Sequence, residues 1–379
     1  KRFSIFANQR FYRLMKILDQ YIIKKYMGTL AFMLVLLSII IVVIDVQSKA
    51  PRIETNGYTV GYFLIHFYPY LMLYYIVTFF SILVFITVIY FTSRIANNTE
   101  IVAYISSGAS FHRFARPYLV ASLIIAAGIL VINHFVLPWS NIKKNELEIY
   151  TMNTVNREKF TANKQISTQL NPQEFIFINS YNRQTNRGSG YLYQKFDKNK
   201  KLLHQINAAE IFWDEKKKLF IINNYLEKMT GKNDTEILKN GDTKEQNFKH
   251  SPEELFPNEL LGQNKTTPDL VRFIKRETEK GNSNINTYLN ELHQRTAMPV
   301  SIVILTFLAL SLSSQKKRGG LGMNLALGIS LAFIFVFSFE VLKVLASEDN
   351  SLPPLLAMWI PNIVFGSLAF YLYWKRANQ

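Results

Sequence analysis

The side chains best suited to chemistry in this sequence are charged residues at the ends of long apolar runs. Asp45 and Lys49 lie one helical turn apart at the end of the first run, and Arg52 follows just beyond. Glu340 and Lys343 are three residues apart within the fifth run. Charged side chains inside or beside such runs are costly, so each of them is a candidate functional residue.

Two interpretations of these charges remain open. Each acid and base could form an ion pair within its own helix, which would lower the cost of burying them. Alternatively, Lys49, Arg52 and Lys343 could form a cationic rim at the depth of the phosphates of the outer leaflet, suited to an anionic lipid. Arg295, at the start of the fourth run, could join that rim.

The stretch Thr99–Pro117 lies between two apolar runs and is a second candidate site. Thr99 is predicted to cap a short helix, with Glu100 in its first turn, where a carboxylate meets the positive end of the helix dipole. Gly108 is predicted to end this helix, Ser110 to cap the next, and Pro117 to open the next apolar run. Four residues at helical spacing form its apolar face: Ile101, Val102, Tyr104 and Ile105.

This short helix also has two interpretations. A loop between spans seldom carries an apolar helix that lipid does not cover, and such a helix suits docking into a groove on another protein. A connector lying on the lipid headgroups fits the local pattern equally well.

Catalytic motifs are missing from the sequence. The pair Gly231–Lys232 lacks the upstream glycine and the following hydroxyl residue of a phosphate loop, so a turn is predicted there. There is no cysteine, and no HExxH or GxSxG pattern occurs. We therefore expect no enzyme activity, no cofactor and no metal site. The histidines are scattered: His66, His112, His134, His204, His250 and His293.

The distribution of charge and hydropathy indicates a membrane protein. The chain of 379 residues is 49% hydrophobic and carries a formal net charge of +16. Residues 138–296 are polar and nearly balanced in charge, so most of the excess positive charge lies beside the apolar runs. A basic chain often binds nucleic acid, but this distribution indicates membrane topology instead, and no nucleic-acid partner is expected.

Six apolar runs approach or exceed the ~20 residues that cross a hydrocarbon core. The basic flanks of six spans all fall on one side, which is therefore the cytoplasm: the N-terminal segment, the loop with Arg94, Arg113 and Arg116, the turn Lys316–Lys317–Arg318, and the tail Lys375–Arg376. The runs are Met27–Val46, Phe67–Phe91, Tyr118–Leu137, Ala297–Leu312, Leu321–Leu345 and Leu355–Trp374, of which the fourth is short.

The polar insert is predicted to be an antiparallel β domain, either a sandwich or a jelly roll. Helical stretches follow from Thr267 and over Thr287–Arg295. Clusters of turn residues, such as Asn240–Asp242, separate its alternating runs, which are Glu174–Tyr181, Gly190–Phe196, Ile206–Trp213 and Leu219–Leu226.

The sequence thus predicts an α-helical membrane protein with six transmembrane helices and an inserted all-β, jelly-roll-like domain in the periplasm. Residues 1–26 form an amphipathic N-terminal segment whose helix, from Met15, is expected on an anionic membrane surface. Residues 27–137 hold the first three spans with the cytoplasmic loop 93–117. Residues 138–296 form the β domain, and residues 297–379 hold the last three spans.

The chain resembles the LptF/LptG permease family, the membrane subunits of the lipopolysaccharide-export ABC transporter. Each shared motif is short, but their order around a β insert is specific. Ile44–Lys49 is more similar to the G-type than to the F-type subunit. The motifs are Ile17–Ile22, Glu100 with Ser107–Ser110 and Pro117, Ile206–Asp214, Tyr288–Pro299, Lys316–Gly320 and Met358–Asn362.

The resemblance implies a non-enzymatic subunit that extracts lipopolysaccharide from the inner membrane. It would pair with a paralogous LptF/LptG-type permease, take power from an LptB-type ATPase dimer, and pass the lipid to LptC-type and LptA-type jelly-roll proteins. Together with the residue patterns above, we expect the coupling residues to be Glu100, Ile101, Tyr104, Ile105, Gly108 and Arg113, and the lipid-binding residues to be Lys49, Arg52, Arg295 and Lys343.

Two other classes remain open. An ABC mechanotransmission protein moves no lipid through the bilayer, but such proteins usually have four spans. A sensor or scaffold that displays the β domain would need neither an apolar docking helix nor charged span ends.

Overall fold

The computed structural model describes residues 17–151, 162–182, 185–231, 235–248, 251–256, 260–279, 285–315, 320–347 and 352–378. They form two compact units, each described by itself. The helical unit contains the chain up to Ser48, Phe63–Asn141, and Asn290 onward. The β unit contains Lys49–Tyr62 and Ile142–Leu289.

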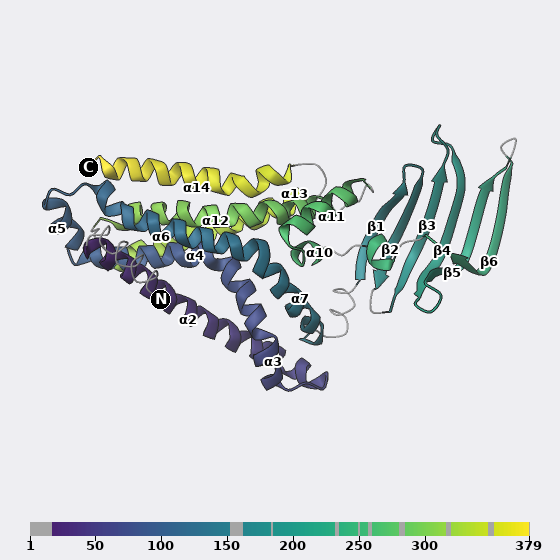
Figure 1. The fold of residues 1–379 in the computed structure, drawn as a ribbon, viewed down its shortest axis with the longest axis horizontal. Coiled ribbons are helices and arrows are strands. Elements are labelled where there is room, and N and C mark those ends of the chain that lie inside the picture. Colours follow the sequence, from purple (N-terminus) through teal and green to yellow (C-terminus); the bar gives the residue numbers. More distant parts are fainter. Residues whose placement is uncertain are drawn as a thin grey trace, which may run out of the picture. The chain divides into compact units, whose positions relative to one another are not determined.

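Six helices in the described residues are long and apolar enough to cross a membrane, as predicted (Figure 1). A helix satisfies its own backbone hydrogen bonds, which a lipid environment requires. The helices are α2 (Ile17–Thr55), α4 (Tyr68–Asn97), a third run made of α6 (Phe111–Val131), a π-helical turn (Ile132–Val136) and α7 (Leu137–Glu148), then α12 (Ile285–Ser313), α13 (Gly320–Ser347) and α14 (Pro354–Ala377). Two short helices are α3 (Val60–His66) and α5 (Glu100–Ser106).

Two boundaries differ from the sequence expectation. The amphipathic start is not a separate helix: its described part, from Ile17, continues without a break through the first span. Gly28 does not interrupt it, because one glycine costs a helix only ~1 kcal/mol. The short fourth run becomes a helix of 29 residues, because the polar stretch from Ile285 is helical too. Met15 and the turn Lys316–Lys317–Arg318 lie outside the described residues.

Close approach and polar contacts join the buried helices of the helical unit. A Cβ added at Gly328 of α13 would collide with the Ile89 side chain of α4, so glycine allows these helices to pack. The Ser81 and Ser301 hydroxyls lie 2.6 Å apart between α4 and α12. The Asn324 amide donates to the Ser93 hydroxyl at 2.9 Å. Small residues and interhelical hydrogen bonds are the usual means of association in lipid, where helices gain little by burying apolar surface.

The β unit holds one antiparallel sheet whose six strands pair in sequence order, β1 to β6 (Figure 1). One face is apolar: Ile176, Ile206 and Ile222 are fully buried. The ring of Phe256, just after α9 (Pro252–Leu255), covers that face 4.5 Å from the Tyr181 ring. The strands are β1 (Ala162–Asn171), β2 (Glu174–Asn182), β3 (Arg187–Phe196), β4 (Leu202–Asp214), β5 (Leu219–Thr230) and β6 (Glu236–Gln246).

The inserted β domain is confirmed, and its described strands pair in a single sheet. A jelly roll or sandwich would divide its strands between two sheets. The predicted turn at Asn240–Asp242 is wrong, because these residues lie inside β6. Both edge strands, β1 and β6, were missed because they are polar and lack the alternation that revealed β2 to β5.

Short helices follow the sheet. They are α10 (Leu260–Gln263) and α11 (Thr267–Glu279). A 3₁₀ turn (Ile149–Thr151) precedes the sheet. The predicted helix from Thr267 is confirmed. Thr266 stands before its first residue, and its hydroxyl donates to the Asp269 carboxylate at 2.6 Å.

A buried carboxylate ties three strands of the sheet together. Glu227 of β5 is 4% exposed and accepts hydrogen bonds from His204 of β4 at 2.6 Å and from Lys244 of β6 at 2.5 Å. Burial alone would raise the pKa of Glu227, but the hydrogen bonds and charges of Lys244 and His204 outweigh it and hold the pKa below its ordinary value of 4.5. The folded state therefore favours the ionised carboxylate.

We predict that Glu227→Gln lowers the stability of the sheet at pH 7 by about 1–3 kcal/mol, because charged hydrogen bonds are lost. Because the pKa of Glu227 is lower in the folded state than in the unfolded state, its ionised carboxylate stabilises the native state at pH values above the unfolded pKa. This contribution is lost as pH falls through the folded pKa. The difference between variant and wild type should therefore shrink below pH 4.5. Amide hydrogen exchange in β5 measures this difference in stability. Asn207→Asp, at an exposed position of β4, is a control for a changed charge, and an equal difference at all pH values would contradict the prediction.

Candidate functional site

The connection between α4 and α6 is built by α5 at one end of the helical unit, where the C-terminus also lies (Figure 1). The predicted helix is confirmed with the predicted end: Gly108 has a φ of +86°, a conformation that glycine adopts without strain. Ser110 caps α6, its hydroxyl accepting from the Arg113 backbone N–H at 3.2 Å.

Two details of this connection were predicted wrongly. Thr99 has a φ of +62° and its side chain caps nothing; its hydroxyl donates to the Asn98 carbonyl at 2.6 Å. Pro117 does not open a helix but lies inside α6, which begins six residues earlier at Phe111.

Most of the expected docking face of α5 is turned toward the chain itself. Ile101 is only 1% exposed within the helical core. The Tyr104 ring lies 5.6 Å from the Phe114 ring, and Ile105 packs against the same core. The surface of α5 that another protein could contact consists instead of Val102, which is 61% exposed, with Ala103, Ser106, Ser107 and Gly108.

Glu100 is also held within the chain. One carboxylate oxygen accepts from the Tyr21 hydroxyl of α2 at 3.1 Å, and the other accepts from the Asn98 amide at 3.1 Å. Glu100 therefore joins the start of α5 to α2, a contact across 79 residues of sequence.

The strongest polar contact at this end joins Arg113 of α6 to Asp19 of α2. Two parallel bonds of 2.8 and 2.6 Å connect the guanidinium to the carboxylate, and Asp19 is only 7% exposed. Bidentate pairs of this kind are strong and geometrically specific. Sequence reasoning missed Asp19, because the partners are 94 residues apart and only the fold brings them together. The acidic residue inside the otherwise basic and apolar first turns was the available signal.

The charges at the opposite end of α2 are arranged differently. The Tyr68 hydroxyl of α4 donates to the Asp45 carboxylate at 3.0 Å, so Asp45 joins two helices. Lys49 is half-buried and Arg52 is exposed. Both belong to the β unit, whereas Arg295 and Lys343 belong to the helical unit.

Arg295 and Lys343 differ in their availability to a ligand. Arg295 is 4% exposed, and its Nε donates to the Glu291 carboxylate at 3.0 Å within α12. Lys343 is half-buried and Glu340 is exposed. The ion pair that Glu340 and Lys343 could form within their helix, one of the two interpretations above, is not found among the described residues. Arg295 is therefore engaged within its helix, and Lys343 is the more accessible cation.

No group of three or more His, Asp or Glu residues lies close enough to hold a metal ion among the residues that the structure describes. Among the histidines, the ring of His112 lies 2.8 Å from the Tyr373 hydroxyl. His250 lies outside the described residues.

Comparison with known families gave one finding that covers both units. The model of the family described as "Lipopolysaccharide export system permease LptF/LptG" matches residues 20–375. The comparison with curated proteins gave no match. The family description names both subunit types together, so the expected likeness of Ile44–Lys49 to the G-type stays a prediction.

We predict that Asp19→Asn destabilises the helical unit by about 2–4 kcal/mol, because the half-buried Arg113 would keep its charge without a carboxylate partner. Thermal unfolding in detergent measures the loss. Glu340→Gln removes one negative charge from an exposed position of the same unit and should change stability by less than ~0.5 kcal/mol. Equal stability of the Asp19 variant and wild type would show that the pair contributes nothing to the fold.

Proposed function

The chain belongs to the LptF/LptG family of lipopolysaccharide export permeases, and from this premise we propose that it takes lipopolysaccharide from the outer leaflet of the inner membrane and passes it to a periplasmic β-jellyroll bridge. Family membership makes it a multi-pass protein of the bacterial inner membrane and the permease component of a transporter. The observation that carries the proposal is the family match across both the six spans and the inserted β domain.

The energy for transport would come from separate subunits. The sequence has no nucleotide-binding motif, so we assign ATP hydrolysis to an LptB-type ATPase dimer shared with a paralogous permease. We assign the exposed side of α5, centred on Val102, to contact with the ATPase. Ile101, Tyr104 and Ile105 would hold α5 to the helical core, so that a push on its exposed side moves α2 and α6 together.

The proposed topology places both termini and the 93–116 loop in the cytoplasm and the β domain in the periplasm. An even number of spans puts both termini on one side, and the basic flanks choose that side. The C-terminus and α5 lie at the same end of the helical unit, which supports this arrangement (Figure 1).

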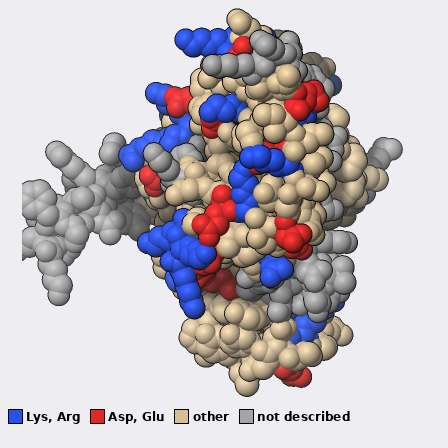
Figure 2. Space-filling view, turned by 90° about the vertical axis from the view of Figure 1, so that its right-hand side faces the viewer, with Lys and Arg blue, Asp and Glu red and all other residues tan. Residues whose placement is uncertain are grey.

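The β domain offers an edge to jelly-roll partners of the LptC and LptA types. Strand β6 pairs with β5 on one side, and its Ile237 and Leu238 are 48% and 62% exposed. The face on this side carries Lys and Arg beside Asp and Glu, with both signs intermixed (Figure 2). Added strands that bind through backbone hydrogen bonds and alternate side-chain contacts suit such an edge.

We assign the lipid headgroup to cations at the outer span ends. Lys49 and Arg52 of α2 are the main candidates, and Lys343 of α13 is a separate and weaker candidate. Arg295, buried against Glu291, would position α12 rather than contact the lipid. A partly desolvated phosphate gains ~1.5–3 kcal/mol from each charged hydrogen bond, more than an exposed cation provides in salt.

We predict that Val102→Glu reduces the affinity of the ATPase subunits at least tenfold, because a carboxylate would be buried at the contact without a partner. Co-purification with the tagged chain measures the affinity. The matched control, Val271→Glu, places the same change on an exposed valine of α11. If the Val102 variant keeps its ATPase and releases lipid normally, α5 is a connector only.

The test of the transport proposal is charge reversal at the outer end of α2. We predict that Lys49→Glu combined with Arg52→Glu weakens lipopolysaccharide crosslinking from a photoreactive residue at position 46 at least tenfold. The complex should remain assembled with an active ATPase. Reversal of Lys275 and Arg276, exposed on α11, is the matched control. Undiminished crosslinking in the first variant would contradict the assignment of these cations.

A further inference from the structure

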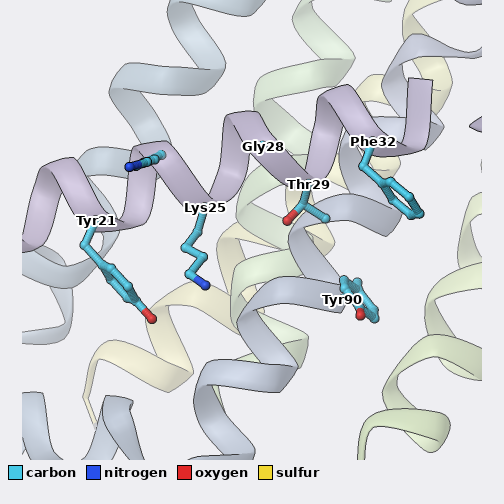
Figure 3. A pocket seen from close by; sticks show the side chains of 7 residues that line it. Tyr21, Lys25, Gly28, Thr29, Phe32 and Tyr90 are labelled. Atoms are coloured by element: carbon cyan, nitrogen blue, oxygen red, sulfur yellow. The ribbon is translucent and has the colours of Figure 1, made fainter. Parts of the chain in front are cut away.

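A hollow of about 530 Å³ lies on the side of α2 that faces α4, near the start of α2 (Figure 3). Apart from one α4 residue, its lining comes from the first four turns of α2. The lining residues are Tyr21, Lys24, Lys25, Gly28, Thr29 and Phe32 of α2 and Tyr90 of α4.

The hollow is polar at one end and apolar at the other. Tyr21 and Lys25 project from α2 to the same side, one turn apart, while Phe32 and Tyr90 flank the opposite end (Figure 3). With a rise of 1.5 Å per residue, Lys25 and Phe32 are separated by ~10 Å along the helix. Thr29 adds a hydroxyl between the two ends. This distance matches a charged headgroup followed by the first part of an acyl chain.

Gly28 opens the middle of the hollow. A Cβ placed there would meet no atom within 4 Å, so the space beside this residue is empty of protein. Phe32 is 62% exposed and the adjoining apolar surface of α2 is uncovered, including Val35 at 59% and Ile39 at 59%. Acyl chains would therefore continue from the hollow along apolar surface.

The cations of the hollow are available to a ligand. Neither Lys24 nor Lys25 forms an ion pair within the described residues, and Lys25 Nζ lies 5.7 Å from the centre of the Tyr21 ring. The acid that faces this end is Glu100, which accepts from the Tyr21 hydroxyl. Arg94, in the last turn of α4, acts electrostatically on the same hydroxyl. Positive charge exceeds negative charge around the hollow.

We propose that this hollow binds one anionic phospholipid, whose phosphate contacts Lys24 and Lys25 and whose acyl chains follow Gly28, Phe32 and Tyr90. Charge complementarity and the change from polar to apolar over ~10 Å favour this occupant. A soluble phosphate would leave the apolar end unfilled. A helix of a partner protein would bury the two lysines. Placing this phospholipid in the cytoplasmic leaflet rests on the proposed topology, but the proposal that the hollow binds it does not.

The first arm of the test alters charge. The delipidated full-length chain in detergent is titrated with dioleoyl phosphatidylglycerol, and bound lipid is counted by native mass spectrometry. Lys24→Gln combined with Lys25→Gln should weaken binding about tenfold or more. Lys375→Gln, an exposed cation in the last turn of α14, should leave it unchanged. Equal binding by the double variant and wild type would overturn the proposal.

The second arm fills the hollow and keeps both lysines. Gly28→Leu should reduce phosphatidylglycerol binding about tenfold, because the added side chain occupies the acyl path. Gly128→Leu, at an exposed glycine of α6 that also has open space beside it, is the matched control. Full binding by Gly28→Leu would overturn the proposed path. Both leucine variants are compared by thermal unfolding, so that lost binding is distinguished from lost folding.

Two further titrations separate the possible ligands. Dioleoyl phosphatidylcholine should bind at least tenfold more weakly than phosphatidylglycerol, and equal binding would overturn selection for an anionic lipid. Inorganic phosphate should not compete at millimolar concentration; effective competition would show a phosphate site without lipid specificity. These measurements use neither ATPase nor lipopolysaccharide, so a negative result would leave the transport proposal intact. Conversely, a failed transport experiment would not decide whether the hollow binds a phospholipid.

Discussion

The bidentate contact between Asp19 and Arg113 is the interaction on which one end of the helical unit depends. It joins α2 to α6 directly, and α5 lies in the connection that leads into α6. With α2 held in place, the Tyr21 hydroxyl reaches Glu100 and Ile101 enters the core. A carboxylate that is 7% exposed needs such a partner, because an unpaired buried charge is far costlier than a satisfied one. The surface that α5 offers to a partner therefore follows from this one pair.

The middle of α2 is held much less tightly than its ends. Its most apolar window is the least buried of the six candidate spans among the described residues. Asp19 contacts α6 near one end, and Asp45 accepts from Tyr68 of α4 near the other. Between them Val43 is 59% exposed. Helices gain little by exchanging lipid contacts for one another, so two polar contacts can decide where this helix lies.

The sequence predicted the elements of the fold better than their contacts. Long apolar runs and alternating strands are local patterns, and they revealed six spans and the strands β2 to β5. The polar strands β1 and β6 were missed because pairing with a neighbour, rather than their own composition, makes them strands. The face of α5 was predicted to dock outward, yet Ile101 is buried, because periodicity shows that a helix has an apolar face without showing which surface covers it. Asp19 was not recognised for the same reason: its partner is distant in sequence.

The two polar contacts of α2 lie far apart along one helix. Asp19 to Asp45 spans 26 residues of unbroken helix, or ~39 Å at 1.5 Å per residue, which exceeds a hydrocarbon core of ~30 Å. If α2 moves as a stiff rod, a displacement imposed on α5 and α6 would reach Asp45. The Tyr68 hydrogen bond would then couple that displacement to α4, the helix that packs against Gly328 of α13. Because only 6% of the most apolar window of α2 is buried by the described residues, such a displacement would break few packing contacts. In the proposed function, α2 would serve as a wall that is fixed at both ends and loosely packed between them.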